Sequence, residues 1–157
     1  MRTALHAGVL LSVTGVVPWA TGTPFVFPSL GPTAYLLATQ RTRYRGRLAD
    51  VAVAHLLGVV AGLVAYHLLA GGVVVTAELA AGSAALGRVV ASGVVALMVT
   101  SAGMLGVDAV HPPACATTLI VALGLLPTVF EGGLIVGAVC VLVATHLAAT
   151  RLTPETA

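Results

Sequence analysis

Long stretches without any charged residue divide the chain, and they limit what it can fold into. Residues 3–40, 51–77, 89–107, 109–130 and 132–150 contain no Asp, Glu, Lys or Arg. A helix needs about 20 apolar residues to cross the hydrocarbon core of a bilayer, so several of these stretches are long enough. Only 8% of all residues are charged, against roughly a quarter in soluble domains. The sequence therefore predicts an integral membrane protein embedded in a lipid bilayer.

Two connectors between the apolar stretches are unusual. The predicted ordinary spans are residues 4–20, 50–71, 88–107 and 132–150. The connectors at residues 21–40 and 108–130 are too apolar for loops in water, and both carry prolines near their beginnings. Because proline is tolerated in the first turn of a helix, each connector predicts an extended lead-in and then a helix that starts within the membrane, over residues 33–40 and 114–125. Irregular backbone at that depth must be buried in protein or line a wet cavity.

The arginines favour a topology in which both connectors cross the bilayer, which gives six crossings. Re-entrant connectors would divide the arginines almost evenly between the two sides, whereas six crossings leave only Arg88 outside. We therefore expect a multi-pass protein of the cell membrane with both termini and the loop at residues 41–49 in the cytoplasm. The cytoplasmic arginines would be Arg2, Arg41, Arg43, Arg45, Arg47 and Arg151.

The order of span, broken segment and span occurs twice, in residues 4–71 and 88–150. Phe27-Pro28 in the first half matches His111-Pro112 in the second, and each half carries two glycines spaced by four, which permit close helix approach within or between chains. Three crossings per half would invert one half relative to the other, as in many transporters. We expect a single all-α transmembrane domain, residues 1–157: a helical bundle of four full spans and two Pro-broken segments in two inverted repeats.

The two helix starts are the candidate binding site. A helix N-terminus offers free N–H groups and the positive end of the helix dipole, which together attract an anion. Two such starts could converge from opposite sides of the membrane; the alternative is that the breaks only serve packing. The predicted substrate-binding residues are Ser29, Gly31, Thr33, His111, Pro112, Pro113, Ala114, Thr117 and Thr118.

His111 is the most informative single residue. It follows Asp108 by three positions, so a carboxylate–imidazole contact could form. A histidine at the start of a half-helix could donate to an anion or couple a proton to transport, and its alternative role is a structural hydrogen bond. The other span histidines, His55, His67 and His146, predict hydrogen-bonded residues of the bundle interior.

Other functions lack the residues they need. No histidine pair has the spacing of metal ligands together with a carboxylate, so we predict no metal and no cofactor. No nucleophile–base set or carboxylate pair indicates an enzyme. No basic stripe alternates with aromatic residues, so nucleic acid is not an expected partner.

The run His111-Pro112-Pro113-Ala114 and the stretch beginning Phe27-Pro28-Ser29-Leu30-Gly31-Pro32-Thr33 resemble the HPP family of small integral membrane proteins. The resemblance covers nearly the whole chain. It implies four spanning helices, and nitrite transport, to which members from cyanobacteria and plastids are linked. Gly31-Pro32-Thr33 departs from the Gly-Ala-Ser type of sequence expected there, which leaves the substrate open. We also expect the chain to act without a fused regulatory domain.

Together these features predict membrane transport of a small inorganic anion, with nitrite as the first candidate. The anion would bind at the two helix starts, His111 and Asp108 would couple protons, and one repeat would move against the other. The alternative is a non-transporting membrane scaffold or accessory subunit. A homo-oligomer, either a dimer or a trimer, is expected because so small a bundle has little interior of its own.

Overall fold

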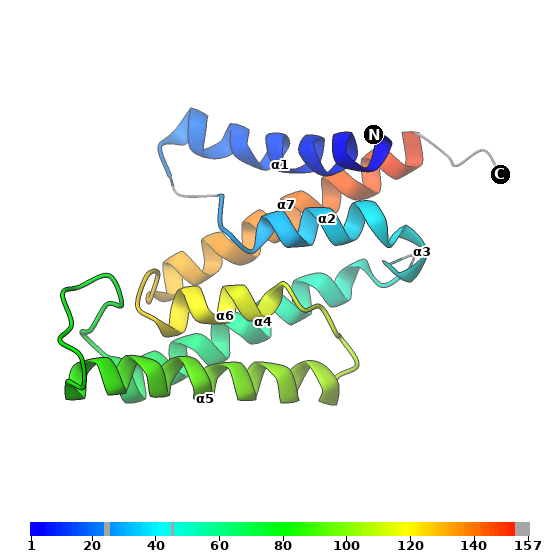
Figure 1. Ribbon diagram of the computed structural model, residues 1–157. Coiled ribbons are helices and arrows are strands. Elements are labelled where there is room, and N and C mark those ends of the chain that lie inside the picture. Colours follow the sequence, from blue (N-terminus) through cyan, green and yellow to red (C-terminus); the bar gives the residue numbers. More distant parts are fainter. Residues whose placement is uncertain (24–25, 45, 153–157) are drawn as a thin grey trace.

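The computed structural model describes residues 1–23, 26–44 and 46–152 and contains no strand in these ranges. A four-residue helix, α3 (Arg41–Tyr44), links two longer ones, and a π-helical turn, η1 (Tyr66–Ala70), continues α4. The longer helices are α1 (Arg2–Thr21), α2 (Leu30–Thr39), α4 (Leu48–Ala65), α5 (Ala84–Gly106), α6 (Ala114–Ala122) and α7 (Val129–Leu152) (Figure 1).

Four helices are long and apolar enough to span a bilayer, which confirms the four predicted spans. They contain 20 to 23 residues each, and at 1.5 Å per residue this gives roughly 30–35 Å, the thickness of a hydrocarbon core. Their bounds are Arg2–Thr21, Leu48–Ala70, Ala84–Gly106 and Val129–Arg151. The chain is therefore a multi-pass membrane protein.

The connectors contain two half-helices, α2 and α6, of 10 and 9 residues. Helix α2 starts three residues earlier than the sequence predicts, because Pro32 fits within its first turn. Helix α6 starts at Ala114, as predicted, and ends at Ala122 instead of Leu125 because Gly124 adopts a left-handed conformation with φ +77°. Pro24 and Phe25, which belong to the predicted lead-in of α2, lie outside the described residues.

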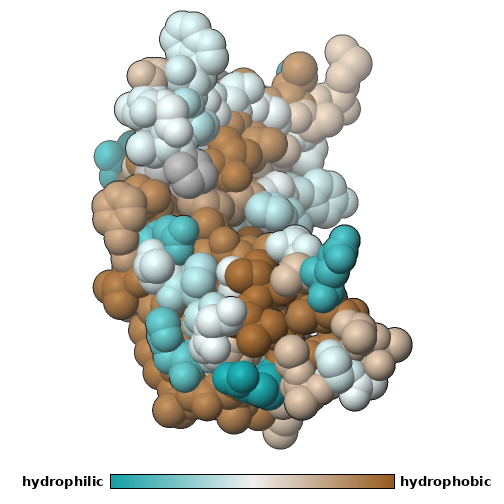
Figure 2. Space-filling model, turned by 90° about the vertical axis from the view of Figure 1, so that its left-hand side faces the viewer, coloured by the Kyte–Doolittle hydropathy of each residue, from teal (hydrophilic) through white to brown (hydrophobic). Residues whose placement is uncertain are grey.

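The half-helices α2 and α6 run roughly along the same direction as the longer helices (Figure 1). Successive long helices alternate in direction, so α2 and α6 are antiparallel (Figure 1). The start of α1, the end of α7 and α3 lie at one end, which we call the α3 end. Figure 2 looks onto the opposite end, where hydrophilic residues gather between hydrophobic borders. Polar ends and an apolar flank are the surface expected of a bundle that crosses a membrane.

The helices pack as two groups that do not coincide with the two halves of the sequence. Helix α4 contacts α5 and α6, whereas α7 contacts α1 and α2, and α4 and α7 join the groups. Figure 1 shows α1 and α2 on one side of the bundle and α5 and α6 on the other. Each half of the sequence thus gives its third helix to the group formed by the other half.

Two glycines allow α4 and α6 to approach closely. A Cβ atom on Gly58 would lie 2.8 Å from the Thr118 hydroxyl oxygen, and one on Gly62 would lie 2.7 Å from the Val121 Cβ. The corresponding glycine of the second half, Gly133, has no atom within 4 Å of a Cβ built on it. The first pair therefore serves packing inside this chain.

We predict that Gly62→Ala lowers the free energy of unfolding in detergent by about 1–3 kcal/mol, because the added methyl group overpacks the α4–α6 contact. The matched variant Gly133→Ala has open space at the same atom and should unfold close to the wild type. Circular dichroism during denaturant titration measures both. Equal losses in the two variants would contradict the close contact.

Candidate functional site

The Thr33 hydroxyl lies between two histidines at the junction of the half-helices. Thr33, in the first turns of α2, is fully buried, and its Oγ1 lies 3.1 Å from Nε2 of His55 in α4. The same oxygen lies 3.1 Å from Nε2 of His111, which precedes α6. The two imidazole rings, which we call the histidine pair, have centroids 5.3 Å apart and are also fully buried.

Each histidine has a second hydroxyl partner on its other ring nitrogen. Nδ1 of His111 lies 2.8 Å from the Tyr44 hydroxyl of α3, and Nδ1 of His55 lies 2.8 Å from the Thr117 hydroxyl of α6. Tyr44, His111, Thr33, His55 and Thr117 therefore form one continuous series of hydrogen bonds, the polar chain. It connects α3 with the first turns of α6 across the middle of the bundle.

Counting donors assigns the protons in this polar chain. Thr33 donates its one hydroxyl proton to the Ser29 carbonyl at 2.9 Å, so its oxygen accepts from both Nε2–H groups of the histidine pair. Each Nδ1 is then an acceptor, and the Tyr44 and Thr117 hydroxyls donate to it. With both imidazoles neutral, each of these donors has an acceptor, which is the arrangement expected of a polar network in an apolar interior.

The structure brings together three of the predicted site residues, Thr33, His111 and Thr117. Thr118 points elsewhere, because its hydroxyl donates to the Ala114 carbonyl and meets the Thr100 hydroxyl of α5 at 2.8 Å. Pro113 and Ala114 are buried, Gly31 is half-buried and Pro112 is exposed.

The two helix starts differ in the donors that they leave available. At α6 the N–H groups of Ala114, Cys115 and Ala116 donate to the carbonyls of His111, Pro112 and Pro113 at 3.0–3.1 Å. At α2 the Ser29 side chain makes no capping bond, and its fully buried hydroxyl has no hydrogen-bond partner among the described residues. An unpartnered buried hydroxyl is uncommon and indicates a place for a further ligand or water.

The expected contact between Asp108 and His111 does not form. The Asp108 side chain is 86% exposed and pairs with Arg47, whose Nη2 lies 3.1 Å from Oδ2 and also donates to the Asp108 carbonyl. Asp108 has φ +53°, a left-handed conformation that aspartate tolerates better than most residues. The three-residue spacing suggested a contact, but this local turn directs the carboxylate outward. Asp108 therefore fixes the connector and does not share a proton with His111.

Two members of the polar chain were not singled out from the sequence. His55 could not be distinguished from His67, whose ring nitrogen instead lies 3.1 Å from the Pro127 carbonyl in an exposed position. The available signal was its spacing of three from Gly58, since residues three and four apart share a helix face. Tyr44 lies in the arginine-rich loop, which the sequence indicates only as a charged cytoplasmic segment.

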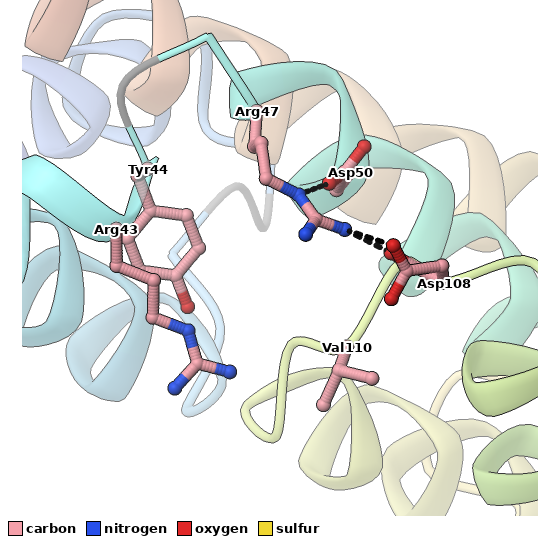
Figure 3. Close-up of a pocket in the computed structure, with 6 residues that line it drawn as sticks. All are labelled: Arg43, Tyr44, Arg47, Asp50, Asp108 and Val110. Carbon is pink, nitrogen blue, oxygen red and sulfur yellow. Dashed lines mark hydrogen bonds and ion pairs between the residues drawn. The ribbon is translucent and has the colours of Figure 1, made fainter.

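A pocket of about 170 Å³ opens at the α3 end, next to the polar chain (Figure 3). Tyr44 lines it, and Arg47 lies between Asp50 and Asp108 on another side, with 2.6 Å between its Nε and the Asp50 carboxylate. Burial raises the pKa of the Tyr44 phenol, and the nearby Arg43 cation offsets part of that rise. Tyr44 is therefore a neutral donor near neutral pH. We call this the α3-end pocket; its remaining lining residues are Arg43 and Val110.

Away from the polar chain, His6 and His146 form a separate contact, with 3.0 Å between their ring nitrogens, that joins α1 to α7. In the part of the chain that the structure describes, no three His, Cys, Asp or Glu side chains converge as metal ligands.

These features define a multi-pass helical membrane protein with a buried polar centre between two half-helices. The sequence profile described as "HPP, transmembrane region" matches residues 1–155. The chain therefore belongs to the HPP family, as its two motifs predicted. Neither the curated proteins nor the solved structures include a significant match.

We predict that Thr33→Val destabilises the bundle by about 2–5 kcal/mol, because three hydrogen bonds are lost and each contributes about 0.6–1.7 kcal/mol inside membrane proteins. Thr14→Val is the matched control, since Thr14 is equally buried but bonds only to carbonyls of its own helix. Unfolding in detergent compares them. A loss no larger than that of the control would show that the Thr33 bonds contribute little.

Proposed function

We propose that the chain transports a small inorganic anion across the membrane, with nitrite as the first substrate to test. The observation that carries this proposal is the buried polar chain between two half-helices in an otherwise apolar bundle. Polar and ionisable groups at membrane depth are costly and mark substrate or proton pathways. Broken helices that meet near the midplane are the usual place for a transported ion.

The donors at the junction suit an anion. Two Nε2–H groups, from His55 and His111, converge on the single oxygen of Thr33. An anion oxygen that replaced the Thr33 hydroxyl would receive both of these N–H groups. The unpartnered Ser29 hydroxyl and the positive end of the α2 dipole lie one turn away on the same helix. Of the two predicted helix starts, α2 is favoured by this hydroxyl alone, because its Leu30 N–H donates to the Phe27 carbonyl and Pro32 has no N–H.

Proton coupling is assigned to His111. A proton added at its Nδ1 would make the ring a cation that holds the anion more strongly, and the Tyr44 hydroxyl would turn to accept from it. Asp108 takes no part in this step, because its carboxylate pairs with Arg47 at the surface.

The proposed movement separates the two packing groups, and this modifies the expectation that one repeat moves against the other. Tyr44 and Thr33 belong to the α2–α3 segment, whereas His55, His111 and Thr117 belong to α4, α6 and the connector before α6. Three of the four bonds in the polar chain therefore cross the boundary between the groups. Occupation of the site by an anion would replace the two bonds to Thr33 and so weaken the contact between the groups, while Tyr44 stays bonded to His111.

The opposite directions of corresponding helices support this mechanism. Each helix of the second half runs opposite to its counterpart in the first half: α5 to α1, α6 to α2 and α7 to α4 (Figure 1). The same pairs of helices are in contact when the halves are exchanged, although α4 packs far more extensively on α6 than α7 does on α2. An exchange of this kind relates the two end states of alternating access in many transporters.

The arginines support a cytoplasmic α3 end. Arg2, Arg43, Arg47 and Arg151 belong to segments at that end, and Arg88 lies near the start of α5 at the other. Arg45, also assigned to the cytoplasm from the sequence, lies outside the described residues. We keep dimeric or trimeric assembly as part of the proposal.

We predict that purified protein in liposomes takes up nitrite, faster with an inward proton gradient, and that His111→Gln lowers the gradient-dependent rate at least about tenfold. Glutamine supplies an N–H donor but cannot take up the proton. The control is the variant His67→Gln, which should transport like the wild type. His67 is an exposed residue of η1 and lies outside the polar chain.

Folded wild-type protein that moves no nitrite, nitrate, formate or chloride would overturn the transport proposal. If His111→Gln also changed the oligomeric state of such inactive protein, the scaffold or accessory-subunit role would take its place.

A further inference from the structure

The α3-end pocket has two sides with different charge. Arg47 contacts both carboxylates of the pocket, Asp50 and Asp108. Arg43 lies apart from this group, on the Tyr44 side, as Figure 3 shows. No ion pair to Arg43 is found among the described residues, and its side chain is exposed. On one side of the pocket Arg47 is ion-paired, and on the other side Arg43 can bind a ligand.

The size of the pocket limits its ligand. Its volume is about 170 Å³, which is room for several water molecules. A small oxyanion fits there together with some of its hydration water. A guanidinium group presents a planar set of donors that matches two oxygens of such an ion.

Tyr44 connects this pocket to the buried site. It lines the pocket, and its hydroxyl lies 2.8 Å from Nδ1 of His111. The Tyr44 ring packs edge-on against the His111 ring with 5.5 Å between centroids, so an ion in the pocket would have to pass this side chain to reach the histidine pair.

We propose that the α3-end pocket is an outer binding site for a small oxyanion, with Arg43 as its charged ligand and Tyr44 as the side chain that separates it from the histidine pair. The inference rests on the proposed transport function only for the identity of the ion. The pocket lining has no net charge, so the attraction for an anion would come from Arg43 itself, which does not share the two carboxylates paired with Arg47.

The test is protection of arginines from phenylglyoxal in detergent-solubilised protein, with and without nitrite and at constant ionic strength. Modification of each arginine is measured by mass spectrometry. We expect saturable protection of Arg43 by at least about threefold, and none at Arg88, whose Nε donates to the Leu69 carbonyl at the other end. Absence of protection at Arg43, or equal protection at Arg88, would overturn the outer site.

A second measurement separates this inference from the transport proposal. Arg43→Gln should raise the KM for nitrite added from the α3 side about tenfold with little change in maximal rate, while Arg151→Gln, at the same end but outside the pocket, should not. Protection of Arg43 in a protein without flux would support the outer site and contradict transport. Wild-type KM in Arg43→Gln together with normal flux would contradict the outer site alone.

Discussion

The Thr33 hydroxyl is the contact on which the buried centre of this protein depends. It accepts from both members of the histidine pair and donates to the Ser29 carbonyl, so one oxygen joins α2, α4 and the connector before α6. In a bilayer no water is available to replace these bonds. Each polar group left without a partner would therefore destabilise the protein by about 1–3 kcal/mol. A hydroxyl at this position thus accepts from both imidazoles and joins the two packing groups, while the hydroxyls of Tyr44 and Thr117 that donate to each Nδ1 favour the neutral rings.

The half-helices explain how such a centre can exist in so apolar a chain. Helices α2 and α6 each span only part of the membrane's depth, and their proline-marked starts place Thr33 and His111 beside each other from opposite directions. Gly58 and Gly62 bring α6 against α4, which sets Thr117 beside His55. At the surface, Arg47 stabilises the turn at Asp108 through an ion pair with its carboxylate. Packing, turn geometry and surface charge thus all serve the same junction.

Much of this arrangement was predictable from the sequence, and the remainder was not for identifiable reasons. Uncharged length predicted the four spans, and proline position predicted where α6 begins and placed the start of α2 within three residues. Thr33, His111 and Thr117 followed from those starts. To predict His55, one must know which face of α4 packs against α6. To predict Tyr44, one must know how the short helix after α2 folds. The predicted contact between Asp108 and His111 was wrong, because a spacing of three residues does not show that the backbone at Asp108 is left-handed. The exchange of third helices between the halves depends on long-range packing that a local pattern does not contain.

The most direct test of this account is ¹⁵N nuclear magnetic resonance of histidine side chains in the protein at neutral pH without added anion. The account predicts that His55 and His111 are both neutral with the proton on Nε2, since Thr33 accepts from both Nε2 atoms and hydroxyls donate to both Nδ1 atoms. Single substitutions of each histidine would assign the signals. A proton on Nδ1 of either ring, or an imidazolium at either position, would contradict the proposed polar chain.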